Sequence, residues 1–144
     1  MRKRLFVVAV AGGALAFAPG AMSRERTQPT LTVKSSRFGK VLFDGRGYAL
    51  YAFTRDGRRS TCYGACAKAW PVYYAKAGLV AGLGVKRALL ATTTRRGGRH
   101  QITYAGRPLY YWAGDTKRGR IGCQNAAEFG GTWLVVRPSG SLVR

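Results

Sequence analysis

The sequence predicts a mainly β domain: a small antiparallel sheet, a sandwich or a partly closed barrel, built from two pseudo-repeats and carrying one short helix. Three observations predict this fold class. Short apolar and aromatic runs alternate with turn sequences rich in glycine. A ten-residue segment occurs twice, 59 residues apart. A single stretch, residues 63–70, has the composition of a helix and ends at a proline.

The first predicted strands lie on either side of a turn. Residues 41–43 form a short apolar run, and residues 48–54 form an apolar and aromatic one. The sequence Asp-Gly-Arg-Gly at 44–47 separates them and supplies two glycines for the positive φ angles of tight turns. We therefore expect a β-hairpin over residues 41–54.

The remaining elements follow from the same signals. Residues 63–70 (YGACAKAW) predict a short helix that Pro71 stops. Residues 75–87 are rich in glycine and alanine and predict no single element. Further strands are expected at 88–94, 100–104, 108–112 and 132–136, with a long loop at 113–131. The total is about six short strands, which suits one small domain.

The N-terminus predicts export. Three basic residues at 2–4 precede an apolar run at 5–17 and then small residues, which is the order found in secretory signal peptides. Glycines and a proline interrupt the apolar stretch, and its core is shorter than the ~20 residues of a spanning helix. A retained anchor is the alternative to cleavage. We expect a signal peptide at 1–20, a flexible lead-in at 21–30 and one β domain at 31–144.

These expectations place the protein outside the cytoplasm. It is predicted to be a bacterial protein that is secreted or held in the cell envelope, with no transmembrane domain after signal removal.

The net charge predicts anionic partners. The chain has 25 lysines and arginines against five acidic residues, a formal charge of +20. The predicted signal peptide holds three of the basic residues and no acid, so the remainder carries +17. Such a charge attracts an anionic cell-wall polymer or another polyanion. The competing interpretation is a solvated surface, because the arginines are scattered, and the sequence contains no specific nucleic-acid motif.

An internal duplication organises the domain. The segment GYALYAFTRD at 47–56 aligns without gaps with GRPLYYWAGD at 106–115. Two copies are too few for a solenoid, so we expect two halves of one core related by approximate two-fold symmetry. The shared pattern is Tyr-x-aromatic-x-x-Asp, and its six residues are Tyr51, Phe53, Asp56, Tyr110, Trp112 and Asp115.

The surroundings of this motif carry a family resemblance. The first copy is followed by CYGACAKAWP at 62–71, and the second is preceded by HQITYAGRPLYY and followed by FGGTWLVV at 129–136. The pattern resembles the bacterial secreted repeat of unknown function, a family of predicted lipoproteins with a Yx(F/W/Y)xxD motif. The resemblance covers residues 38–137, with repeats at about 38–71 and 99–137. It implies export and no established activity, and this chain lacks the lipid-acceptor cysteine of the lipoprotein members.

The six motif residues have two interpretations. Alternation along a strand places Tyr51 and Phe53 on one face, whereas Asp56 is expected in the following turn, accepting main-chain N–H groups. The favoured, structural interpretation makes the aromatic residues core. The functional one makes both Tyr/aromatic/Asp sets a paired ligand site. In a chain this basic, the aspartates are expected to pair with an arginine, for which Arg55, Arg58 and Arg107 are candidates.

The cysteines predict a local disulfide. Cys62 and Cys66 are four residues apart, and in a regular helix their Cβ atoms would lie ~5–6 Å apart, whereas a disulfide needs ~3.5–4.5 Å. A distorted turn at Gly64 permits the bond, and we favour it over a pairing with Cys123. A metal site is not expected, because His100 is the only histidine and soft ligands are few.

The chemistry that the sequence offers excludes most enzyme classes. There is no HExxH motif and no glycine-rich phosphate loop, and any catalytic triad would depend on one histidine. We expect no catalytic residues and no cofactor. The predicted function is a non-catalytic cell-envelope or extracellular binding or structural module. The alternative is a redox or metal-binding role through the Cys62/Cys66 pair.

Overall fold

The structure is a computed structural model that describes residues 27–76 and 78–144. The predicted signal peptide at 1–20 and residues 21–26 of the predicted lead-in lie outside the described residues. No helix in the described part of the chain has the length and apolar character needed to cross a lipid bilayer.

The described residues contain eight short strands, one α-helix and one turn of 3₁₀ helix, and the strands form three antiparallel sheets with the orders β1-β2, β3-β8-β7 and β4-β5-β6. This confirms a mainly β fold with one short helix, and the described residues form no closed barrel. The elements are β1 (Leu31–Ser36), β2 (Gly39–Asp44), β3 (Tyr51–Phe53), α1 (Ala65–Ala69), η1 (Arg87–Leu89), β4 (Leu90–Thr94), β5 (His100–Tyr104), β6 (Arg107–Pro108), β7 (Ala126–Glu128) and β8 (Gly131–Val135).

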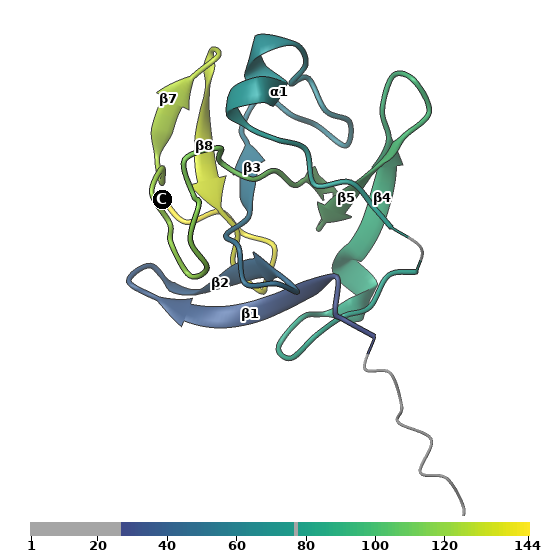
Figure 1. The fold of residues 1–144 in the computed structure, drawn as a ribbon, viewed down its shortest axis with the longest axis vertical. Coiled ribbons are helices and arrows are strands. Elements are labelled where there is room, and N and C mark those ends of the chain that lie inside the picture. The colour runs from purple at the N-terminus through teal and green to yellow at the C-terminus, as the bar shows by residue number, and fades with distance from the viewer. Residues whose placement is uncertain (1–26, 77) are drawn as a thin grey trace, which may run out of the picture.

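Figure 1 shows how the sheets surround the centre of the domain. The β1–β2 ribbon lies at the base, β7 and β8 on one side, β4 and β5 on the other, with β3 between them and α1 at the top. Two clusters of buried side chains fill the interior. One contains the aromatic residues Tyr51, Trp70, Tyr110 and Trp133, and the other contains the aliphatic residues Leu42, Leu50, Ile102 and Leu109.

The duplication appears as an approximate two-fold relation. The main chains of Tyr51 and Tyr110 exchange two hydrogen bonds, each 2.9 Å from N to O. Hydrogen bonds on either side repeat as well: Leu50 N–H donates to the Leu42 carbonyl, and Leu109 N–H donates to the Ile102 carbonyl. We call residues 31–76 the first half and residues 90–144 the second half. Their symmetry axis passes between the two motif tyrosines.

The predicted hairpin over 41–54 is present in a shortened form, in which residues 42–44 pair with residues 48–50. Asp44 N–H donates to the Tyr48 carbonyl, and one isolated bridge joins Phe43 to Ala49. The ladder partner of β2 is β1, and β3 pairs instead with β8. The expected strand at 48–54 is divided between two partners: Ala49 and Leu50 contact β2, whereas Tyr51–Phe53 pair with β8.

Other boundaries differ in the same way. The predicted strand at 108–112 is reduced to β6, and the predicted loop at 113–131 contains β7. The described end of the predicted lead-in contacts the domain: Thr30 N–H donates to the Val80 carbonyl, and the Tyr73 hydroxyl donates to the Thr30 carbonyl at 2.6 Å.

Candidate functional site

The two motifs are joined crosswise through their tyrosines and aspartates. The Tyr51 hydroxyl donates to Asp115 Oδ2 at 2.5 Å, and the Tyr110 hydroxyl donates to Asp56 Oδ2 at 2.5 Å. Each tyrosine thus serves the aspartate of the other repeat. The main-chain pairing of the two tyrosines positions both contacts, so the structure brings four of the six motif residues together at the boundary between the halves.

The second oxygen of each aspartate closes the loop that follows it. Asp56 Oδ1 accepts hydrogen bonds from the N–H and the hydroxyl of Thr61, both at 2.7 Å. Asp115 Oδ1 accepts the N–H of Gly122 at 2.9 Å and lies 3.6 Å from Arg120 Nε. A carboxylate that accepts main-chain N–H groups fixes a turn, and here it does so over five and seven residues.

The ion pairs differ from those expected for the motif aspartates. Arg55 donates to the Phe129 carbonyl and Arg107 to the Gly140 carbonyl, so both cap main-chain oxygens of the second half. The arginines that form ion pairs within residues 27–76 and 78–144 are Arg46, with Asp44, and Arg120, with Asp115.

The motif aromatics belong to a stack of rings. Trp133 lies between Phe53 and Trp70, with ring centroids 4.2 and 4.0 Å away and interplanar angles of 8° and 1°. Trp112, the repeat equivalent of Phe53, is tilted and lies 6.5 Å from Trp70. Each motif tyrosine also meets the tryptophan of its own half edge-on, an arrangement that aromatic pairs prefer. The central ring of the stack comes from the second half and the rings on either side of it from the first, so the stack joins the two halves.

Burial limits what these residues can do chemically. Tyr51 and Tyr110 have no exposed surface, and Phe53 and Asp115 are buried. Burial first, and then the hydrogen bonds to the carboxylates, raise the pKa of both tyrosines above the ordinary value. They therefore stay neutral hydrogen-bond donors. Of the six motif residues, only Asp56 and Trp112 have partly exposed side chains that a ligand could contact.

The structure contains the disulfide between Cys62 and Cys66, with Cα atoms 5.3 Å apart. This confirms the favoured pairing. Gly64 adopts a φ of 56°, which is the distortion expected between the two cysteines. Cys123 is a free, half-buried thiol.

Cys123 is the structural counterpart of Cys62. Each cysteine directly follows the residue whose N–H binds the motif aspartate, and each is followed two positions later by a residue with positive φ. In the second half that residue is Asn125, with a φ of 63°. Ala127 then takes the place of Cys66. The gapless alignment of the two copies did not pair Cys123 with Cys62, because the second loop is two residues longer.

A buried arginine supports the disulfide loop. Arg95 is only 6% exposed, and its guanidinium donates to Ser60 Oγ, to Gln101 Oε1 at 2.9 Å and to the Cys62 carbonyl at 2.6 Å. The hydroxyls of Ser60 and Tyr110 are also hydrogen-bonded. Sequence reasoning did not single out Arg95, because a basic residue in a turn is normally exposed.

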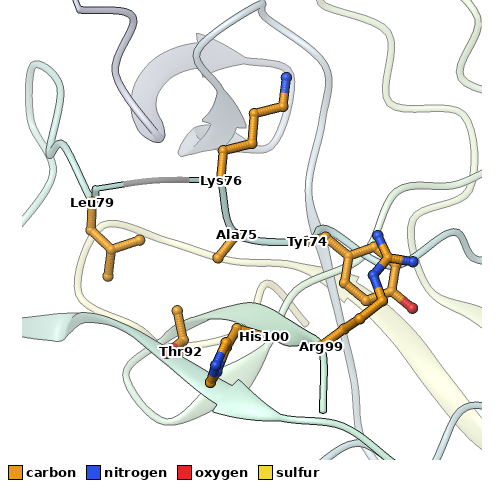
Figure 2. A pocket seen from close by; sticks show the side chains of 7 residues that line it. All are labelled: Tyr74, Ala75, Lys76, Leu79, Thr92, Arg99 and His100. Atoms are coloured by element: carbon orange, nitrogen blue, oxygen red, sulfur yellow. The ribbon is translucent and has the colours of Figure 1, made fainter. Parts of the chain in front are cut away.

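The surface offers a pocket that the sequence did not predict. It has a volume of about 440 Å³ and lies between residues 74–76 and Leu79 on one side and the strands β4 and β5 on the other. Figure 2 shows Thr92 and His100 side by side on the strands, with Leu79 and Ala75 facing them. The Arg99 guanidinium lies 3.3 Å from the centre of the Tyr74 ring at one end of the pocket.

This pocket is basic. It is lined by Lys76, Arg99 and His100 and by no carboxylate, although the Lys76 side chain points away from His100. His100 is exposed, with Nδ1 3.4 Å from the Thr94 hydroxyl oxygen. In the described ranges, no three histidine, cysteine, aspartate or glutamate side chains gather closely enough to hold a metal ion.

Comparison with known proteins agrees with the duplicated architecture. Residues 32–73 and 91–137 both match the model of a protein family described as a secreted repeat of unknown function. Each match contains one copy of the motif and falls in one half. No curated protein and no solved structure matches the chain. Because the two matched segments cover more than half of its residues, the chain belongs to this family of secreted repeats of unknown function.

Proposed function

We propose that the protein is an exported, non-catalytic module of the bacterial cell envelope or extracellular space that binds an anionic polymer through its basic surface. The family description supports export. The large formal charge supports attraction to polyanions.

The observation that carries this proposal is the state of the carboxylates. All four acidic side chains of the described residues accept hydrogen bonds inside the domain. Besides the motif aspartates, Asp44 accepts the Tyr111 hydroxyl at 2.9 Å, and Glu128 accepts Trp70 Nε1–H at 2.7 Å. With two ion pairs in this part of the chain, most lysines and arginines have no acidic partner. Their charge is therefore available to an external polyanion.

Exposed arginines on the disulfide side of the domain are suited to this role. The exposed Arg96 lies over the ring of Tyr63, with its guanidinium 3.9 Å from the ring centre, while the buried Arg95 packs against the same ring at 4.1 Å. The nearby loop adds further exposed arginines, Arg58 and Arg59. An array of guanidinium groups suits the phosphate groups of a phosphodiester polymer, because each can form bidentate hydrogen bonds.

The test is a titration of the full chain with poly(glycerol phosphate) at several salt concentrations. The logarithm of the binding constant should fall linearly with the logarithm of the salt concentration, because bound counterions are released. A neutral polysaccharide should not bind. Substitution of Arg58, Arg59 and Arg96 by Gln should weaken binding and flatten the slope, while Thr93→Gln serves as the uncharged control. Binding that is equally strong at low and high salt would contradict the proposal.

The redox or metal alternative receives less support from the geometry. Cys62 has no exposed surface and Cys66 is 7% exposed, so the bonded sulfurs are shielded in the folded domain. A reactive disulfide is normally accessible. Thiol labelling after mild reductant treatment distinguishes the two functions: a redox disulfide would open in the native protein, and a structural one would resist.

A further inference from the structure

The strands β1 and β4 occupy equivalent places in the two halves, and Leu31 and Leu90 are again 59 residues apart. The outer edge of β1 is covered by the segment at 80–83. Val33 N–H donates to the Leu83 carbonyl at 3.1 Å, and the N–H of Gly82 donates to the Leu31 carbonyl at 2.8 Å. The approach is so close that a Cβ atom on Gly82 would lie 2.6 Å from that carbonyl oxygen.

The equivalent edge of β4 is open. Thr92 lies opposite Ile102, whose N–H donates to the Tyr73 carbonyl and whose carbonyl accepts from Leu109 N–H. Ile102 therefore directs its main-chain groups away from β4. Opposed residues of an antiparallel pair either both bond to each other or both point outward, so the Thr92 groups point to the outer edge. Thr94 lies opposite His100, whose carbonyl accepts the N–H of Ala75 on the far side of β5, so the Thr94 groups point outward as well. In the described residues, no hydrogen bond from outside the β4–β5 ladder reaches the main chain of Thr92 or Thr94.

We propose that this open edge of β4 binds an extended acidic segment of another protein as an added β-strand. Main-chain donors and acceptors on a free edge are a template for such strand addition. The strand sequence is LATTT, with none of the prolines, charges or bulges that usually protect an edge. Residues 91, 92 and 94 are exposed and therefore accessible.

Hollows on both faces of β4 would receive the side chains of the added strand. The pocket of Figure 2 lies on the face of Thr92 and presents Arg99 and His100. A second hollow of about 680 Å³ lies on the other face, where Arg58 and Arg107 meet Ala91 and Thr93. Asp56 also lines it, but its oxygens are occupied by the hydrogen bonds described above. Because strand side chains alternate, acidic residues on either face would meet arginine.

The same charges exclude a second copy of this chain as the occupant. Two β4 strands paired antiparallel would bring the exposed Arg87 of one copy towards the exposed Arg96 of the other. Like charges opposite one another destabilise strand pairing, and each copy carries a large positive charge. Charge complementarity therefore selects an acidic partner.

Hydrogen exchange of main-chain amides tests the site. The probe is a capped heptapeptide that alternates glutamate and valine, added to the full chain. In the free protein the amides of Thr92 and Thr94 should exchange rapidly, whereas those of Ala91 and Thr93 should be protected by β5. The peptide should protect Thr92 and Thr94. A peptide N-methylated at alternate residues cannot donate those hydrogen bonds and should not bind.

Thr92→Pro is the matching protein variant. It removes an outward N–H that β5 does not use, and proline is tolerated on edge strands in this orientation. We expect peptide binding to weaken about fivefold, because a strand-addition hydrogen bond contributes about 1 kcal/mol. Thr92→Val keeps the N–H and should bind normally. Salt-dependent binding to poly(glycerol phosphate) should be unchanged in both variants, which separates this inference from the proposed function.

Three outcomes would overturn the inference. The N-methylated peptide could bind as tightly as its parent, or the peptide could protect amides away from β4. A dimer of the free protein that Thr92→Pro dissolves would show that a second copy occupies the edge. If Thr92→Pro fails to fold, the binding of the parent and N-methylated peptides to the unmodified protein still tests whether strand addition occurs.

Discussion

The loops that follow the two motif aspartates are each held by a hydrogen bond to the aspartate, but they differ in length and in covalent closure. In the first half, Asp56 holds Thr61, the Cys62–Cys66 disulfide closes the turn, and α1 follows. In the second half, Asp115 holds Gly122 across a longer loop, the cysteine is free, and the β7–β8 hairpin follows. The parts that stay the same are the aspartate, the main-chain N–H that it binds and the tyrosine that reaches it from the other half.

This difference shows which interactions define the fold. The shared hydrogen bonds cross the boundary between the halves, so neither half satisfies its own aspartate and tyrosine alone. The loops need only present one N–H group to a carboxylate, and their length and covalent closure vary. We infer that the crossed pairs and the aromatic stack stabilise the whole domain, whereas the disulfide stabilises one loop.

The largest effect is expected for Trp133→Ala in the shared stack. This ring contacts both Phe53 and Trp70, and its removal should cost about 3–5 kcal/mol, as for other fully buried large aromatics. Trp112→Ala is the matched control, because that ring is half-buried and tilted, and it should cost clearly less. Urea unfolding measures both. Equal costs would mean that the stack does not join the halves.

The crossed pairs should differ in strength. Tyr51→Phe leaves the buried Asp115 without its hydroxyl donor and should cost about 1.5–3 kcal/mol. Tyr110→Phe should cost less, because Asp56 is half-buried and water can replace the lost donor. A double-mutant cycle of Tyr51→Phe with Asp115→Asn isolates the pair energy. A larger loss for Tyr110→Phe would reverse the comparison.

Alkaline pH should weaken the same pairs. Burial and hydrogen bonding raise the pKa of Tyr51 and Tyr110 in the folded state, and burial raises the pKa of Tyr73 to about 12. The unfolded chain loses these protons near pH 10 and the folded chain retains them. The stabilisation is therefore complete below about pH 10 and is lost as the pH rises above it. Unfolding at fixed urea across this range should show a shallower fall for Tyr51→Phe.

Much of this architecture follows from the sequence, because the repeat is gapless. The constant offset predicted two halves around a symmetry axis, and the alternation of Tyr51 and Phe53 predicted shared packing. The crossed pairing was not predictable. Within one copy the tyrosine and aspartate are five residues apart, and that odd spacing only indicates that they do not share a strand face. Each tyrosine finds its aspartate in the other copy, and only the tertiary structure brings the two residues together.

Two further features escaped sequence reasoning for the same reason. The sequence of β1, LTVKSS, mixes polar and apolar residues, and its strand character comes from pairing with β2 and from coverage by residues 80–83. The burial of Arg95 depends on acceptors from three separate segments. Neither signal is local, so composition and periodicity could not supply it.

The disulfide should contribute less than the stack. It closes a loop with a sequence separation of 4, and the chain-entropy estimate for so short a loop is about 2 kcal/mol. A Cys62→Ala/Cys66→Ala variant should therefore stay folded and keep its binding to poly(glycerol phosphate), with the unfolding midpoint shifted to lower urea. Loss of the fold would show that the first loop, unlike the second, depends on covalent closure.

The smallest effect is expected at Cys123, the counterpart of Cys62. Cys123→Ala removes a half-buried thiol but keeps the N–H that lies 3.4 Å from the Tyr51 hydroxyl oxygen, so it should cost about 1 kcal/mol or less. Burial, and then the charges of Glu128 and Asp115, raise the pKa of this thiol, so it should alkylate slowly until urea unfolds the chain. If Cys123→Ala were as costly as loss of the disulfide, the second loop would depend on its cysteine as strongly as the first, and covalent closure would not be what distinguishes the halves.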